Sequence, residues 1–288
     1  MSAKRHATMN GKRTAGRVGQ YAILLVGAFV MIVPFLWMVS TSLTPDSVIL
    51  SYKLIPSRIT FSNYVKAWNF SRNFDEDVSL GTFFINSVIV SFFITVPSLV
   101  IDSLAGYVLA RRRIPGRDLL FYMALATMMI PFYVIAIPLF LVVRKLGWLE
   151  SYQGMIVPFV ASGFSIFMFK QFFQALPEDL EDAARVDGCS PFRTYASIML
   201  PLSKPVIATM TIFKVMWSWN LFFWPLLIIN NIRLKTLPLA LTMFRGLNVT
   251  QWGTLCAGMT IATIPVVIVY LSMQDQFQKG ITMGAIKG

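Results

Sequence analysis

The residues best placed to act on another molecule lie in one polar segment, 176–205, which reads LPEDLEDAARVDGCSPFRTYASIMLPLSKP. Its acidic residues are followed by Ala183 and Ala184, and then by Gly188. Alanine has almost no side chain, so another surface can approach that part of the backbone closely. The chemistry that this spacing indicates is non-covalent docking of a separate protein, not catalysis.

Local signals predict two short helices in this segment. Pro177 suits a first helical position, the acidic residues that follow complement the positive helix end, and Gly188 can take the left-handed conformation that ends a helix. The first helix, over residues 178–187, would be about 15 Å long. Ser190 and Pro191 then begin a second helix, which Pro201 is expected to end. The alternative is a plain surface loop whose helices lie on the membrane.

Two charged residues lie inside apolar runs, where charges are rare and usually functional. Asp102 precedes Arg111 by nine residues, which is roughly 13 Å along a helix, and Lys214 follows Lys204 by ten, roughly 15 Å. Both helices start from the same membrane face, so the two charges can lie at similar depth and pair. The alternatives are a snorkelling Lys214 and an Asp102 in a water-filled vestibule.

Trp217, Trp219 and Asn220 are candidates for a translocation path. Flat apolar rings beside a hydrogen-bonding amide would suit a sugar, which presents both C–H faces and hydroxyl groups. The alternative is that the tryptophans pack between helices.

The composition predicts that these residues are positioned by a membrane-embedded helical bundle. Of 288 residues, 56% are hydrophobic and 13% charged, against about 25% charged in ordinary soluble domains. The net charge of +12 is spread over the ends of apolar runs and does not form a nucleic-acid-binding patch. Six runs reach the roughly 20 residues that cross a bilayer. They are Tyr21–Leu43, Thr82–Ala110, Leu119–Val143, Tyr152–Phe173, Pro205–Ile229 and Leu255–Gln274.

Lysine and arginine placement predicts the orientation. The first run exceeds a signal-peptide core in length and lacks a cleavage site, so it is expected to remain as the first span. Most basic residues then fall on the cytoplasmic side if both termini lie there. The last outer loop, 230–251, with Arg233, Lys235 and Arg245, runs against this rule.

Other functional classes find little support in the sequence. His6 is the single histidine, and Cys189 and Cys256 fall on opposite membrane sides, so no metal site is expected. A polytopic enzyme would need a histidine–carboxylate or serine–lysine cluster, and none presents itself. An ion-coupled secondary transporter would be expected to show paired repeats, and none is visible.

The polar segment resembles a known motif. The order is an acidic residue, Ala183-Ala184, three residues, Gly188, nine residues, Ile198, one residue and Leu200-Pro201. It is similar to the EAA loop of permease subunits in binding-protein-dependent ABC importers. The family's glutamate is replaced by Asp182, although Glu181 directly precedes it, which puts the exact partner contact in doubt.

The resemblance covers nearly the whole chain after residue 20. The sequences MWSWN at 216–220, FWPL at 223–226, QFQKG at 276–280 and GAIKG at 284–288 resemble carbohydrate-type permeases, and the smaller permease of maltose-type importers in particular. The aspartate often found after the asparagine is Leu221 in this chain. This resemblance implies an all-α protein with one transmembrane permease domain over 1–288, a cytoplasmic tail at 1–18 and a cytoplasmic EAA loop at 176–204.

The resemblance further implies alternating access driven by other subunits in a bacterial inner membrane. Two ATPase subunits would bind ATP and magnesium, since this chain lacks a phosphate loop and is expected to be neither an enzyme nor a cofactor carrier. A second, related permease and an extracytoplasmic solute-binding protein would complete the system. The residues implied in ATPase coupling are Glu181, Asp182, Ala183, Ala184, Asp187, Gly188, Ile198, Leu200 and Pro201.

The sequence leaves the cargo open. A mono- or oligosaccharide follows from the subfamily resemblance. Anionic oligosaccharides, glycerol phosphates and polyamines are alternatives, and the basic residues of the loop 230–251 mildly favour an anionic cargo. By resemblance, this loop is also expected to reach into the solute-binding protein, the alternative being a plain connector.

Overall fold

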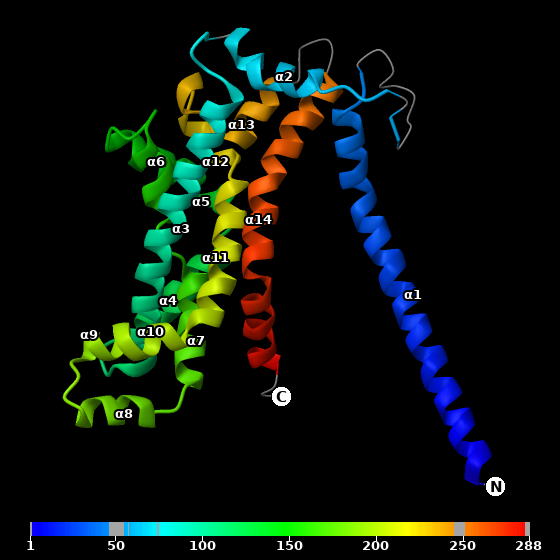
Figure 1. The fold of residues 1–288 in the computed structure, drawn as a ribbon. Helices are drawn as coiled ribbons and strands as arrows, with labels where there is room; N and C mark the ends of the chain where they lie inside the picture. Colours follow the sequence, from blue (N-terminus) through cyan, green and yellow to red (C-terminus); the bar gives the residue numbers. More distant parts are fainter. Residues whose placement is uncertain (1, 46–54, 57, 74, 245–250, 286–288) are drawn as a thin grey trace. The chain divides into compact units, whose positions relative to one another are not determined.

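A computed structural model describes residues 2–45, 55–56, 58–73, 75–244 and 251–285, and within them the side chains of all but residues 2–16, 18, 73 and 276–285. These residues form helices and turns and no strand (Figure 1). The all-α class predicted from the apolar runs is confirmed. Of the predicted outer loop 230–251, residues 245–250, which include Arg245, lie outside the described residues.

The helices group by contact into two units, each described separately. The first unit covers 1–68 and 244–261, and the second covers 69–243 and 262–288. The long helices are α1 (Ser2–Ser42), α3 (Leu80–Arg111), α4 (Arg117–Met129), α5 (Phe132–Lys145), α7 (Gly163–Ala175), α11 (Lys204–Trp219) and α14 (Trp252–Ala285).

Short helices connect the long ones. They are α2 (Ser62–Asn69), η2 (Phe70–Asn73), α6 (Tyr152–Ile156), η3 (Val157–Phe159), α8 (Asp179–Val186), α9 (Pro191–Thr194), the π-helical η4 (Tyr195–Met199), α10 (Leu200–Leu202), α12 (Phe223–Ile228), η5 (Ile232–Leu234), α13 (Leu237–Leu241) and η6 (Thr242–Phe244).

Five of the six predicted spans are confirmed within the described residues. Helical segments long and apolar enough to cross a membrane cover Gly19–Ser42, Leu80–Arg111, Tyr152–Ala175, Lys204–Ile228 and Trp252–Asp275. Prolines Pro34, Pro97 and Pro265 lie inside their helices, as expected where neighbouring helices satisfy the freed backbone groups.

The third predicted run, Leu119–Val143, is not one straight helix. It divides into α4 and α5, which meet at an angle of 104°. The bend occurs at Pro131. The backbone of Ile130, the residue before it, is extended, because a proline ring disfavours the helical region for the preceding residue. Pro131 thus interrupts the predicted run, whereas Pro138 lies within α5.

In the first unit, α2 is tied to the end of α1. The Asn63 side chain is fully buried, and its Nδ2 donates to the carbonyl oxygens of Ser42 and Thr44 at 3.0 and 2.8 Å. The hydroxyl of Tyr64 lies 2.8 Å from that of Ser42. One buried amide thus satisfies the carbonyl group of the last residue of α1 and that of Thr44, two residues beyond it.

In the second unit, α3 is the central helix. One core cluster joins it to α5, α6 and α12, with Val90, Ile94, Met155 and Trp224 at its centre. A second cluster joins its far end to α7, η4 and α11. Its members are Tyr107, Phe169, Phe173, Tyr195, Met199, Val206 and Met210. Figure 1 shows α8, α9 and α10 lying across the ends of α3, α7 and α11.

The closest approach between α3 and α7 depends on Gly106. A Cβ atom at this position would lie 2.5 Å from the Cβ of Phe169 and 2.9 Å from the backbone nitrogen of Lys170. Small residues allow this kind of backbone approach between membrane helices.

Gly106→Ala is therefore expected to force α3 and α7 apart and to lower the free energy of unfolding by about 1–3 kcal/mol, the usual cost of overpacking. Titration with denaturing detergent measures this loss. Gly27→Ala is the control, because Gly27 of α1 has open space around it. Equal stability of the two variants would contradict the assignment.

Candidate functional site

The first predicted helix of the polar segment is present as α8, Asp179–Val186. Gly188 has φ of +75°, the left-handed conformation expected for it. The Cys189 amide donates to the Ala184 carbonyl at 2.9 Å, and the Asp187 amide to that of Ala183 at 2.9 Å. These bonds satisfy carbonyl groups that would otherwise be open at the helix end.

The nine residues implied in coupling do not share one exposed face. On α8, Glu181 and Ala184 are buried, with 9% and 2% of their surface exposed. Asp182, Ala183 and Asp187 are exposed, as is Gly188 beyond the helix. Val186, which sequence reasoning did not select, is 88% exposed. A partner approaching α8 would therefore meet Asp182, Ala183 and Val186.

Glu181 faces the end of α3. Its carboxylate oxygens lie 4.0 Å from Nε of Arg111 and 3.7 Å from a terminal nitrogen of Arg112. Arg111 also donates to the Leu176 carbonyl and lies 3.7 Å from the Glu178 carboxylate. Sequence analysis used Arg111 only to gauge the depth of Asp102 and did not pair either arginine with the acidic segment. The signal that could have paired them with α8 is the complementarity between a run of arginines and the acidic segment.

The second predicted helix of the polar segment begins as predicted and ends one residue later than predicted. The Ser190 side chain accepts from the Arg193 amide at 3.3 Å, and Pro191 opens α9. The helix continues without a break through η4 and α10 and ends at Leu202, one residue beyond Pro201, so the predicted end is displaced by one residue. Ile198 and Leu200 are half-buried against the cluster around Phe173 and Met199.

Asp102 and Lys214 are brought together inside the second unit. The Lys214 Nζ lies 3.8 Å from Asp102 Oδ2, and their side chains are 9% and 0% exposed. Asp102 also accepts from the Ser98 hydroxyl at 2.6 Å and from the Ser162 amide at 3.0 Å. This burial disagrees with both a snorkelling lysine and a water-filled vestibule. The group links α3, the start of α7 and α11.

The three candidates for a translocation path are separated by the structure. Trp219 is buried, donates to the Ala262 carbonyl at 3.0 Å, and packs edge-on to Phe84, which is the packing role weighed above. Trp217 is 45% exposed and lies edge-on to Phe159. Asn220 is exposed, and its amide caps the Met216 carbonyl. Trp217 and Asn220 therefore remain the available pair.

At the opposite end of α3, side chains hold the segment 230–237. Asn86 donates to the carbonyl oxygens of Arg233 and Lys235, both at 2.9 Å. The Arg233 guanidinium binds Asp75 at 2.7 Å and Asp77 at 3.0 Å. Its hydrogen bond to Asp75 lowers the pKa of that carboxyl group below the ordinary value. The charge of Arg233 is thus already compensated within the chain.

Glu150 anchors the start of the same segment. Its carboxylate accepts from the backbone amides of Asn230 and Asn231 at 2.9 and 3.0 Å and from the Asn230 side chain. Desolvation raises the pKa of Glu150, but these donors outweigh it, so the pKa is lowered overall. The ionised form is the one that holds the segment.

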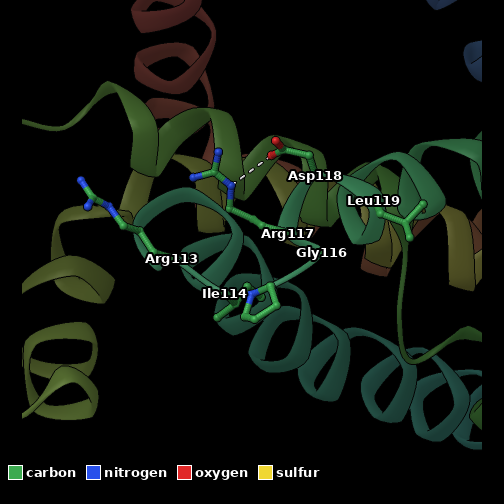
Figure 2. A pocket seen from close by; sticks show the side chains of 7 residues that line it. Arg113, Ile114, Gly116, Arg117, Asp118 and Leu119 are labelled. Atoms are coloured by element: carbon green, nitrogen blue, oxygen red, sulfur yellow. Dashed lines mark hydrogen bonds and ion pairs between the residues drawn. The ribbon is translucent and has the colours of Figure 1, made fainter.

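A surface pocket of about 650 Å³ lies where α3 connects to α4, lined by residues 113–119 (Figure 2). Gly116 makes the turn with φ of +72°, and Arg117 binds Asp118 at 3.0 Å. Arg113 is exposed and lines this pocket, whereas Arg111 and Arg112 engage the segment around α8. The arginine run thus divides between two surroundings. Within the described residues, no three potential metal ligands come together.

Comparisons with known proteins agree with the motifs. Residues 102–283 match the family model described as "Binding-protein-dependent transport system inner membrane component". The arabinooligosaccharides transport system permease protein AraQ of Bacillus subtilis is 34% identical over 277 residues, which cover 93% of this chain and 96% of that protein. The trehalose/maltose transport system permease protein MalG of Thermococcus litoralis is 32% identical over 273 residues, covering 92% and 96%.

Two further matches are to proteins whose names refer to other kinds of cargo. The sn-glycerol-3-phosphate transport system permease protein UgpE of Salmonella typhimurium is 38% identical over 199 residues, which cover 68% of this chain and 71% of that protein. A chain in the crystal structure of a bacterial ABC transporter involved in the import of the acidic polysaccharide alginate is 26% identical. It has a TM-score of 0.79, with 92% of this chain and 97% of that chain covered.

The buried pair Asp102–Lys214 generates a double-substitution prediction. Asp102→Asn leaves a buried ammonium group without its counter-charge and is expected to cost about 3–5 kcal/mol in the free energy of unfolding. Adding Lys214→Met should recover most of this loss, because no uncompensated charge then remains. Detergent-induced unfolding measures both.

Asp118→Asn is the matched control, since Asp118 pairs with Arg117 at the surface and its side chain is 69% exposed. An exposed pair is expected to contribute about 1 kcal/mol at most. Losses that simply add in the Asp102/Lys214 double variant would rule out the pairing.

Glu150 generates a pH prediction. Because its folded pKa is lowered, its contribution is present above the ordinary pKa of a glutamate and is lost as the pH falls through the lowered value. Glu150→Gln should reduce the hydrogen-exchange protection of the Asn230 and Asn231 amides at neutral pH. After correction for intrinsic exchange, wild type and variant should converge in acid. Equal protection at neutral pH would show that Glu150 does not anchor the segment.

Proposed function

The chain belongs to the family of binding-protein-dependent transport system inner membrane components, and from this premise we propose that it is a membrane-spanning subunit of an importer that moves a carbohydrate by alternating access. The observation that carries the proposal is α8. This short helix ends at the left-handed Gly188 and presents Asp182, Ala183 and Val186 outward. A separate protein that binds there would meet a charged residue, a small residue that permits close approach, and an apolar residue.

A separate ATPase supplies the energy in this proposal. The chain has no phosphate loop, so ATP and magnesium bind to partner subunits and this chain performs no hydrolysis. Two ATPase subunits seat against the coupling helices of this permease and a second, related permease. A solute-binding protein delivers the cargo on the opposite side. The loop around α8 then lies in the cytoplasm, together with both termini of the chain.

A saccharide is the cargo that the findings favour. The names of AraQ and MalG refer to saccharides, and the matching solved structure concerns a polysaccharide. Trp217 and Asn220 expose an aromatic ring and an amide, which together suit C–H faces and hydroxyl groups. The match to UgpE keeps glycerol phosphate as the second candidate. Arg233 gives little support to an anionic cargo, because Asp75 and Asp77 already compensate it.

The coupling role is tested by Ala183→Trp in the complete complex, co-expressed with its companion permease, ATPase and binding protein. A large ring on the exposed face should keep the ATPase from seating and lower ATP-driven uptake by at least about tenfold, the equivalent of about 1.4 kcal/mol. The same substitution should leave the unfolding of the permease unchanged, since Ala183 is exposed.

Ala183→Ser is the control, because serine preserves the small side chain. Uptake is measured in vesicles with arabinooligosaccharides, maltose, trehalose, lactose and glycerol 3-phosphate. Accumulation of a saccharide only with an active ATPase is the expected result. Uptake that persists when the ATPase is inactivated would replace the proposal with an ion-coupled transporter.

A further inference from the structure

Glu181 and Asp182 are neighbours with opposite surroundings. The Glu181 side chain is 10% exposed and the Asp182 side chain 66%. Asp182 pairs only with Arg185 of its own helix, at 3.1 Å, among its described contacts. A protein that approaches α8 from solvent therefore meets Asp182, whereas Glu181 is covered by its own chain.

We propose that Glu181, Arg111 and Arg112 form an internal joint that transmits movement of α8 to α3, so that Glu181 is a positioning residue and not a contact for the ATPase. This inference rests on the proposed function, because it assigns the route by which force leaves α8. The joint is an interaction of one buried carboxylate with two guanidinium groups from the last turn of α3 and the residue after it.

Burial makes the joint costly to separate. The contacts are ion pairs of 3.7–4.0 Å, and separating α8 from α3 would leave the buried Glu181 carboxylate without a counter-charge, which is costly. The Arg111 side chain is 6% exposed, and it also holds the Leu176 carbonyl just before α8. Arg112 donates to the Tyr107 hydroxyl and lies over the Tyr107 ring, 5.2 Å from its centre. Each guanidinium is therefore fixed by a second contact.

The second helical stretch of the polar segment, which comprises α9, η4 and α10, also contacts α3. The Tyr195 hydroxyl lies 2.7 Å from that of Ser103, and the rings of Tyr195 and Tyr107 are 5.2 Å apart. Ser103, Tyr107 and Arg111 recur at intervals of four residues, so they lie along one side of α3. Both helical stretches of the polar segment, α8 and α9–η4–α10, thus contact one line of α3 side chains.

From this line the movement can reach the spans. Asp102, next to Ser103, pairs with Lys214 of α11 and accepts from the Ser162 amide at the start of α7. Gly106 packs directly against Phe169 and Lys170 of α7. Among the described residues, the ion pairs that α8 makes beyond itself go to α3. The route runs from α8 to α3, and from there to α7 and α11.

The test compares Glu181→Gln with Asp182→Asn in the complete transport complex. Glu181→Gln keeps the shape and removes the charge. It should leave co-purification of the ATPase unchanged, while the amount of cargo transported per ATP hydrolysed falls several-fold. Asp182→Asn should act in the opposite sense and weaken co-purification of the ATPase. A purely structural role of Glu181 would lower complex yield without changing the cargo-to-ATP ratio of what assembles.

Arg112→Gln provides a second, independent variant, and it carries the test alone if Glu181→Gln does not accumulate. It should reproduce the loss of cargo per ATP, and the double variant should lose less than the two single losses combined, because both remove the same interaction. The joint is refuted if Glu181→Gln releases the ATPase as Asp182→Asn does, or if the accumulating variants couple like wild type. A wild-type complex without ATP-dependent uptake would instead refute the proposed function.

Discussion

The need to compensate charge along one central helix, α3, governs the second unit of this protein. A charge removed from water must find a partner, and α3 carries Asp102 inside an apolar run and Arg111 at its end. Each partner comes from a different segment: Lys214 from α11 and Glu181 from α8. Segments that are distant in sequence are therefore attached to one helix by ion pairs. Removing one partner of such a pair leaves the other charge buried without compensation. Apolar packing supplies the area of contact, and the ion pairs add specific contacts to α11 and α8.

Features governed by neighbouring residues were predictable from the sequence. The ends of α8 follow from acidic residues at its start and from Gly188, whose left-handed conformation requires only local chain geometry. Five spans follow from hydropathy, because the bilayer requires a minimum apolar length. The similar depth of Asp102 and Lys214 follows from helical rise, since both were counted from the same membrane face, and the structure places the two helices side by side. Their burial, however, depends on neighbours that hydropathy does not identify.

Features that depend on which way a side chain faces were not predictable. Glu181 and Asp182 are both acidic, so no apolar pattern distinguishes the inward residue from the outward one, and only the positions of Arg111 and Arg112 decide it. The bend at Pro131 was missed for a related reason. Interior prolines such as Pro97 continue their helices, and whether a freed carbonyl finds another partner depends on tertiary contacts. Trp219 likewise resembled a path residue until its buried bond to Ala262 was seen.

The two alanines of α8 place a small side chain on each face of this helix. Ala183 is exposed and leaves room for an approaching protein, whereas Ala184 is 2% exposed and lets α8 lie close to its own chain. A helix that contacted only a partner protein would have no attachment to α3, and a helix buried on both faces would leave no surface for a partner to bind. The same division separates Asp182 from Glu181, one turned to solvent and one to α3. The eight residues of α8 thus offer one face to solvent and the other to α3.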